Sequence, residues 1–403
     1  MRDPFLRATV TNFFFCASVN GFVLLPLHIQ ALGGTEIEIG LVMGLYSAVG
    51  IVGQPLIGPW VDVAGRKPFM LLGVSLLVGA AMLALAAPAI PVLALVRLLQ
   101  GVAFSAFFVA NFSYVVDLVP PARRGWALGI YGVSGMVSTA IAPLIGEWTI
   151  RWLGFRALCA LGLVFALAAL ALVIRLREPP RRDLPPGPGW EWTVAGAVLD
   201  LAQRHMVVAL FFGLGTGTIF AFLPTFAENL GVRTLALFYT AYAGAAMAVR
   251  IVGGRLIDTR GRRAVIVPSM FVQAAAMALL AGLAFGHAAW PRMPALPIIT
   301  LAGLLSGGAH GFLYPALAAL VTDLAPAARR AAIFGVFSAM LLVGQTGGAM
   351  VFGYVAHGLG YGFMWAVLAQ CCAIGSLLSV ALPVDRARTA AVVRFRREPS
   401  GVD

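Results

Sequence analysis

Two short polar segments with the same pattern interrupt an otherwise apolar sequence. In each segment an aspartate is followed three residues later by a glycine and then by two basic residues, and a further aspartate ends a later apolar stretch. The residues concerned are Asp62, Gly65, Arg66 and Asp117 in the first half of the chain and Asp258, Gly261, Arg262 and Asp323 in the second. Carboxylate and guanidinium groups form strong charge-assisted hydrogen bonds, and glycine permits a sharp chain reversal. We therefore predict two local ion networks, one in each half.

Arg97, Arg250 and His310 fall inside long apolar stretches. An arginine in the middle of a membrane helix costs about 2.5–3.5 kcal/mol, so each one requires an explanation. His310 could titrate near neutral pH and carry a proton, or it could hydrogen-bond a neighbouring helix. We interpret Arg250, one turn before Gly254, as a brace for the second network rather than a substrate residue. No Asp or Glu falls at the middle of an apolar stretch, which argues against recognition of cations by a deep carboxylate.

The composition decides the class of protein. Apolar residues make up 61% of the 403 residues and charged residues 11%, against about 45–50% and 25% in soluble domains. We predict an all-α integral membrane protein and exclude a soluble enzyme, a disordered chain and a disulfide scaffold. The four cysteines lack metal-ligand spacing, and no nucleophile–base pair or phosphate loop is present. We therefore expect no enzymatic activity, no metal and no cofactor.

Eleven windows free of Asp, Glu, Lys and Arg approach or exceed the roughly 20 apolar residues that cross a bilayer. They cover residues 8–35, 39–61, 68–96, 98–116, 126–146, 157–174, 206–227, 234–249, 264–290, 293–322 and 331–384. The last window is too long for one crossing, and the glycines at Gly358, Gly360 and Gly362 divide it. We predict twelve transmembrane helices in two pseudo-symmetric six-helix halves, with both termini on one side.

The basic residues indicate which side is cytoplasmic. Of the 28, 22 fall on the side that holds both termini, four on the other side and two inside helices. Because cytoplasmic loops collect Lys and Arg, we predict cytoplasmic N- and C-termini in a bacterial inner membrane. This distribution also explains the net charge of +12 without nucleic acid.

A proline-rich segment near the chain midpoint suggests a linker between two halves. We predict an N-terminal half over residues 1–177, a cytoplasmic linker over 178–205, a C-terminal half over 206–384 and a basic tail over 385–403. The tail could contact anionic lipid, or it could serve only to set the topology. The repeated polar segments follow corresponding helices of the two halves, which indicates a duplicated six-helix unit.

At these residues the chain resembles the major facilitator superfamily. The segment from Gly58 to Lys67 resembles that superfamily's signature loop, its copy follows the eighth helix, and Arg97-Leu-Leu-Gln100-Gly101 is similar to its R-x-x-Q-G motif. The fifth helix only partly resembles the glycine-rich motif of drug antiporters, because Ala142 and Glu147 stand where glycines are expected. Within the superfamily, the pattern looks most like bacterial drug and sugar efflux permeases.

The resemblance implies roles for both groups of residues. The two ion networks would latch the cytoplasmic side shut while the transporter opens outward; the alternative is that they cap loops and set topology. Helices one, four, seven and ten would line a central cavity. The expected cavity residues are Asn20, Arg97, Gln100, Phe104, Phe108, Thr216, His310 and Tyr314. Each could instead be a packing residue, and Arg97 could extend towards the outer interface.

The most consistent function is secondary active transport by alternating access. Such transporters hold substrate near the midplane between two halves that rock. We expect proton-coupled export of a small amphiphilic solute, neutral or anionic, by a monomer that contacts membrane lipid and no nucleic acid. The alternatives are a sugar, metallophore or organic-acid transporter or an uncoupled facilitator of the same fold. A membrane enzyme, a receptor and a non-transporting scaffold are further alternatives.

Overall fold

The computed structural model describes residues 2–86, 89–120, 124–178, 203–325 and 330–383. Within these ranges the regular structure consists of helices alone. The first segment of the chain contains α1 (Arg2–Gly21), η1 (Phe22–Leu24) and α2 (Leu25–Ala31). The rest of the N-terminal half comprises α3 (Glu36–Ala64), α4 (Arg66–Ala86), α5 (Ile90–Leu118), α6 (Arg124–Leu153) and α7 (Phe155–Ile174). The C-terminal half comprises α9 (Arg204–Asn229), α10 (Ala236–Arg260), α11 (Arg262–Ala289), α12 (Ala295–Leu324) and α13 (Arg330–Val380).

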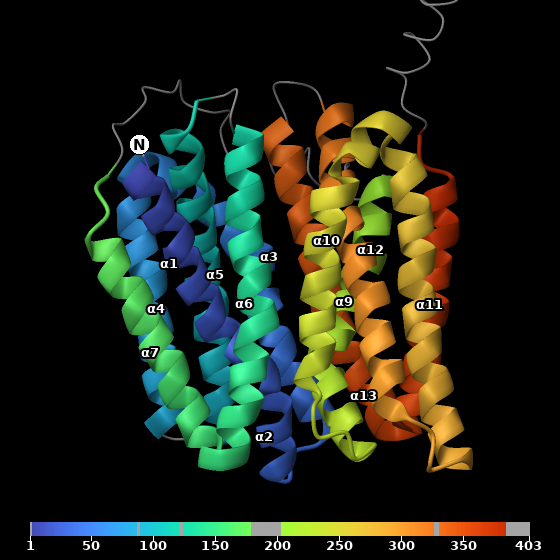
Figure 1. The fold of residues 1–403 in the computed structure, drawn as a ribbon. Coiled ribbons are helices and arrows are strands. Elements are labelled where there is room, and N and C mark those ends of the chain that lie inside the picture. Colours follow the sequence, from blue (N-terminus) through green and yellow to red (C-terminus); the bar gives the residue numbers. More distant parts are fainter. Residues whose placement is uncertain (1, 87–88, 121–123, 179–202, 326–329, 384–403) are drawn as a thin grey trace, which may run out of the picture.

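The helices form two bundles that stand side by side (Figure 1). We call the end of the molecule that carries the N-terminus the terminal end, and the opposite end the distal end. The helices α2, α6 and α9 finish at the distal end, where α3, α7 and α10 begin. The predicted linker, apart from its first and last residues, and the basic tail lie outside the described residues.

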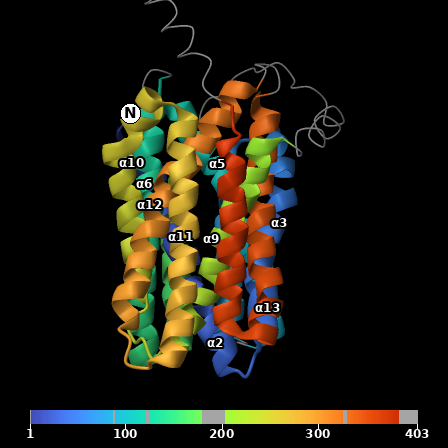
Figure 2. The same cartoon turned by 90° about the vertical axis from the view of Figure 1, so that its right-hand side faces the viewer.

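The helices have the length and composition of membrane spans. Ten described stretches are long and apolar enough to cross a bilayer, the last of them from Ile333 to Val380. The backbone of α13 leaves helical geometry at Gly360, where φ is 81°, and the chain reverses direction there (Figure 2). A shorter apolar helix spans Ala236–Ile251 within α10. With α13 divided and α10 included, the arrangement is compatible with the twelve predicted crossings.

Local sequence explains where several helices begin and end. Thr35 caps α3 in a reciprocal capping box, since its hydroxyl accepts from the Glu38 N–H while the Glu38 carboxylate accepts from the Thr35 N–H. Gly65 and Gly261 have φ angles of 104° and 90°, which favour glycine. Each of these glycines separates two helices that run in opposite directions, so each predicted reversal occurs at its glycine.

In the part of the chain that the structure describes, buried apolar side chains form three clusters, of which one joins the two halves. Phe22, Leu25 and Ile29 of the N-terminal half pack in the same cluster as Phe222 and Phe226 of the C-terminal half, at the distal end. Towards the terminal end each half has a separate cluster of its own. The halves therefore share a core at the distal end and are packed independently at the terminal end.

Candidate functional site

The two predicted loop networks have nearly the same geometry. Arg66 Nε lies 3.1 Å from Asp117 Oδ2, and Arg262 Nε lies 3.2 Å from Asp323 Oδ2. Each arginine also donates through Nη1 to a backbone carbonyl five residues earlier, at 3.4 Å for Arg66 and 3.0 Å for Arg262. The internal duplication thus extends to individual bonds. The side chains of the other two predicted members, Asp62 and Asp258, lie outside the described residues.

Glu178 is an additional member of the first network that sequence reasoning missed. Its carboxylate accepts from the backbone N–H groups of Arg66 and Lys67, at 2.6 and 2.7 Å. The first turn of a helix leaves backbone N–H groups without partners, and a carboxylate there is favourable. Two basic residues at the start of α4 were a signal that an acidic partner was required. Lys67 also donates from Nζ to the Ile174 carbonyl at 3.1 Å.

Arg97 is buried beside aromatic side chains. Only 6% of its surface is exposed, its Nη1 donates to Gln100 Oε1 at 2.9 Å, and its guanidinium carbon lies 4.6 Å from the centre of the Tyr46 ring. The Phe104 ring lies 5.5 Å from Tyr46 and stacks on Phe108 at 5.1 Å. The structure therefore joins four predicted cavity residues and their neighbour Tyr46 into one cationic and aromatic surface, which we call the Arg97 cluster: Arg97, Gln100, Phe104, Phe108 and Tyr46.

Two hydrogen-bond donors of the Arg97 cluster are unpaired among the described residues. Arg97 Nε and Gln100 Nε2 are buried donors without a partner among the described residues. The neighbours that act electrostatically on the guanidinium include the Tyr46 phenol and no described carboxylate. Buried donors that remain unpaired are costly, so such a cluster is suited to an acceptor that arrives from outside the protein.

Asn20 and Thr216 interact mainly with neighbouring helices. Asn20 Nδ2 donates to Ser138 Oγ at 2.8 Å and to Thr139 Oγ1 at 3.1 Å, which joins α1 to α6. Thr216 Oγ1 donates to the carbonyl of Gly213 at 2.9 Å and accepts from Gln345 Nε2 at 3.4 Å. The Asn20 hydrogen bonds join two helices, and Thr216 bonds within its own helix and to Gln345; their place in a cavity stays a prediction.

His310 lies in an aromatic group on the C-terminal half. Its ring centre is 5.2 Å from Phe212, 5.6 Å from Tyr242 and 6.4 Å from the nearly parallel Tyr314 ring. Arg250 belongs to the same group, because its guanidinium interacts electrostatically with the Tyr242 and Tyr314 phenols. The interpretation of Arg250 as a brace for the second loop network stays a prediction, because the Asp258 side chain lies outside the described residues.

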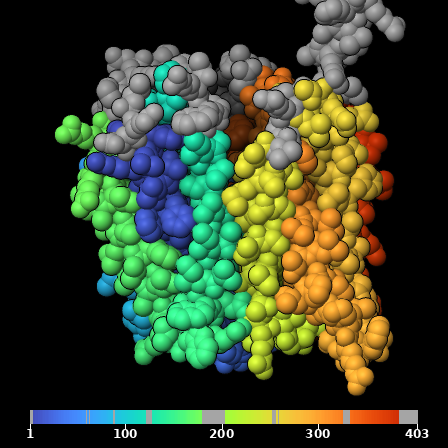
Figure 3. All heavy atoms as spheres, viewed as in Figure 1, coloured from blue at the N-terminus to red at the C-terminus, as the bar shows by residue number. Residues whose placement is uncertain are grey.

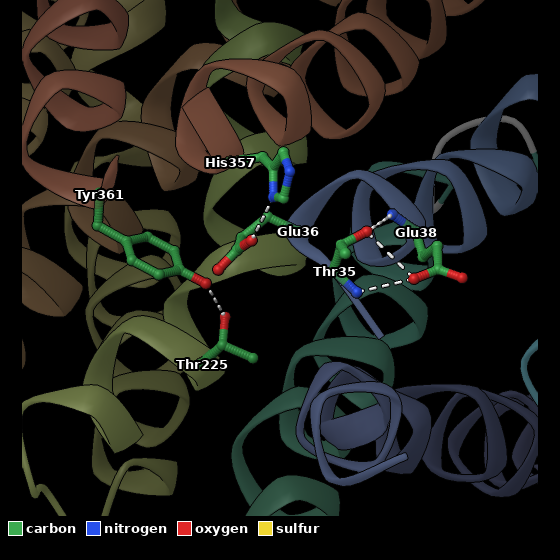
Figure 4. A network of polar contacts seen from close by, with 6 residues as sticks. All are labelled: Thr35, Glu36, Glu38, Thr225, His357 and Tyr361. Atoms are coloured by element: carbon green, nitrogen blue, oxygen red, sulfur yellow. Dashed lines mark hydrogen bonds and ion pairs between the residues drawn. The ribbon is translucent and has the colours of Figure 1, made fainter. Parts of the chain in front are cut away.

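The two halves touch through polar contacts at the distal end. His357 Nδ1 on α13 lies 3.2 Å from Glu36 Oε2, the first residue of α3 (Figure 4). Figure 4 also shows Tyr361 donating to Thr225 Oγ1 at 2.8 Å, a bond within the C-terminal half. Gln30 Nε2 donates across the halves to Asn229 Oδ1 at 3.0 Å.

Glu147 makes a further cross-half contact at this end. Its Oε2 accepts from the backbone N–H of Ala236, the first residue of α10, at 2.7 Å. Its Oε1 lies 3.4 Å from Arg151 Nη2, and Arg151 donates in turn to the Arg233 carbonyl. Further along the same pair of helices, which lie against each other in Figure 3, Thr240 Oγ1 donates to the Ala140 carbonyl at 3.0 Å. Sequence reasoning identified Glu147 only as a departure from the drug-antiporter motif.

The arrangement is suited to holding and moving a solute. Two groups of aromatic and cationic side chains lie inside the bundles, one in each half, and the halves are joined at the distal end. Among the described residues no group of three or more His, Cys, Asp or Glu side chains could hold a metal ion.

Curated proteins with similar sequences are membrane exporters. The chain is 23% identical to the staphylopine export protein of Staphylococcus aureus over 395 residues, which cover 94% of this chain and 96% of that protein. It is 24% identical to the multi-drug resistance efflux pump PmrA of Streptococcus pneumoniae over 393 residues, with 94% and 96% coverage.

Solved structures and a family profile agree with this likeness. The fold matches the nucleoside transporter NupG with a TM-score of 0.76 at 15% identity, covering 94% of this chain and 99% of that one. It matches the human organic anion transporter MFSD10 with a TM-score of 0.68 at 18% identity, covering 93% and 99%. The sequence profile of the Major Facilitator Superfamily matches residues 8–291 and 205–402. The chain is therefore an integral membrane transporter, not an enzyme, and belongs to the Major Facilitator Superfamily.

Proposed function

We propose that this transporter exports a small amphiphilic solute across the bacterial inner membrane by alternating access, with protons as the coupling ion. The Arg97 cluster is the observation that carries the solute class, since a cation with an unpaired donor lies over the Tyr46 ring, and Phe104 and Phe108 extend this aromatic surface. Aromatic faces attract the apolar part of a solute, and the guanidinium attracts an acceptor or an anion. The names of the staphylopine exporter and the efflux pump PmrA support outward transport.

The packing of the halves supports alternating access. A shared core and polar contacts join the distal end, whereas each half has its own core towards the terminal end. If the termini are cytoplasmic, as the excess of basic residues on their side predicts, this conformation is closed to the outside. Opening the distal end would then expose the central residues to the outside.

The test is transport into sealed proteoliposomes with an imposed pH gradient. The probes share one ring system and differ in head group: 2-naphthalenesulfonate, 2-naphthalenesulfonamide and trimethyl(naphthalen-2-ylmethyl)ammonium. The fixed charges of the first and third prevent passive trapping by the gradient. We expect the sulfonate or the sulfonamide to accumulate above its equilibrium level, and a protonophore to abolish the accumulation. Protein-free vesicles are the control.

Two other outcomes would change the proposal. Equilibration without accumulation would identify an uncoupled facilitator of the same fold. Flux equal to that of protein-free vesicles for all three probes would contradict the proposed solute class.

A further inference from the structure

Arg250 is a cation at the seam between the two halves. It lies on α10, and a Cβ atom added to Gly132 of α6, in the other half, would lie 3.6 Å from Arg250 Nη1. Because Gly132 has no side chain, the space beside the guanidinium stays open. The group therefore lies where the two halves move against each other during alternating access.

The electrostatic surroundings of Arg250 lack an opposite charge. Its interacting neighbours are the phenols of Tyr242 and Tyr314 together with the ring of His310, and no described carboxylate is among them. A cation inside a membrane protein without a counter-charge is costly and marks a functional position by default.

Three buried polar atoms in this group have no hydrogen-bond partner among the described residues. They are Arg250 Nε, Tyr242 Oη and His310 Nδ1. Tyr242 is only 2% exposed, so bulk water does not solvate its hydroxyl. The guanidinium N–H and the phenol O–H are donors, and either can point at a carboxylate or sulfonate oxygen. An anionic head group would satisfy both donors and neutralise the cation at once.

We propose that Arg250, together with Tyr242, Tyr314 and His310, binds the anionic head group of the transported solute. The inference rests on the proposed transport function and narrows its solute class from neutral or anionic to anionic, a carboxylate or sulfonate on an apolar body. The tyrosine and histidine rings pack beside the head group, and Gly132 leaves it room between the halves.

The first test is binding, measured by thermal stabilisation of the purified protein with the sulfonate and the sulfonamide. These probes have nearly the same shape and differ by one charge. We expect the wild type to bind the sulfonate more tightly, and Arg250→Gln to weaken it by roughly 10- to 100-fold, the range for a lost hydrogen bond to a charged group. The sulfonamide should bind both proteins alike, which also shows that the variant is folded.

Two further variants separate a binding residue from a structural one. Arg250→Lys keeps the charge and should keep part of the preference for the sulfonate. Arg156→Gln removes an exposed arginine on α7 and should leave the preference unchanged. Equal weakening of both probes in Arg250→Gln, or an unchanged preference, would show that Arg250 braces the seam and would overturn the inference.

Proteoliposome flux separates this inference from the proposed function. Transport of the sulfonate that is lost in Arg250→Gln supports both. Transport of the sulfonate that is independent of Arg250 leaves the transport function standing and refutes the anion site. Binding that depends on Arg250 without flux of any probe supports the site and contradicts the transport proposal.

Discussion

The two loop arginines make equivalent bonds but differ in exposure. The Arg66 and Asp117 side chains are 13% and 23% exposed, whereas those of Arg262 and Asp323 are 21% and 54% exposed. Water and salt weaken an ion pair as exposure rises, and fully exposed pairs contribute about 0–1 kcal/mol. The same Arg–Asp ion pair therefore occurs twice in this chain, once less exposed to solvent and once more exposed, and the two copies can be compared directly.

We expect a stronger interaction in the first copy. Double-mutant cycles with alanine at Arg66 and Asp117 should give a coupling energy of about 1 kcal/mol, against less than about 0.5 kcal/mol for Arg262 and Asp323. The measurement is reversible unfolding in mixed detergent micelles at low and high salt. A larger coupling in the second pair would show that exposure does not determine the strength of this contact.

At the scale of helices, α6 holds the first turn of α10 across the seam. The Glu147 carboxylate accepts from the Ala236 N–H at the N-terminus of α10, where the helix dipole is positive. Arg151 supports the same contact through Glu147 and the Arg233 carbonyl. A charged acceptor at a helix N-terminus makes a stronger hydrogen bond than a neutral one, so this contact favours the closed distal end.

Replacing Glu147 by Gln should therefore open the distal end more often. The loss of about 1–2 kcal/mol would change the ratio of open to closed molecules by about 5- to 30-fold. Spin labels at Trp148 and Leu237, in a background without native cysteines, should report longer distances in the variant. Glu228→Gln removes an exposed carboxylate from the same end and is the control. Identical distance distributions in all three proteins would contradict this role of Glu147.

The elements were more predictable from sequence than their contacts across the seam. Long apolar runs indicate helices in any context, and repeated Asp–Arg spacing indicated the Arg66–Asp117 and Arg262–Asp323 pairs. The Glu147–Ala236 bond joins residues 89 positions apart, and its donor is a backbone group that every residue except proline possesses. Because any residue except proline could supply this N–H, the sequence does not indicate which residue bonds to Glu147, and the structure is needed to identify it. For the same reason, the aromatic surroundings of Arg250 could not be anticipated from its place before Gly254.

At the scale of the whole molecule, the two halves have separate cores towards the terminal end and are in contact at the distal end. Backbones of α3 and α13 approach closely there, since a Cβ on Gly353 would lie 2.7 Å from the Glu36 carbonyl oxygen. The His357–Glu36 contact lies beside this crossing (Figure 4). Alternating access requires these helices to separate at the distal end.

A covalent tether at this crossing should stop transport. Cysteines at Glu36 and His357, joined by a short reducible cross-linker, should abolish flux, and dithiothreitol should restore it. Cysteines at Phe285 and Phe363 form the matched control, because both side chains are exposed, their rings lie 5.5 Å apart and both belong to the C-terminal half. Undiminished flux through the tethered first pair would contradict separation of the halves at this end.

At the distal end, the α6 side and the α10 side of the interface differ in the substitutions that they tolerate. Glu147 and Arg151 supply side chains to it, whereas Arg233 and Ala236 supply backbone atoms. Positions 233 and 236 can therefore change their side chains and keep both bonds, whereas positions 147 and 151 cannot. Proline at position 236 is the exception, because it favours the first turn of a helix yet lacks the N–H that Glu147 receives. Substitutions at positions 233 and 236 should accordingly leave these two contacts intact, whereas Thr240 contributes its side chain to the interface and should tolerate change less well.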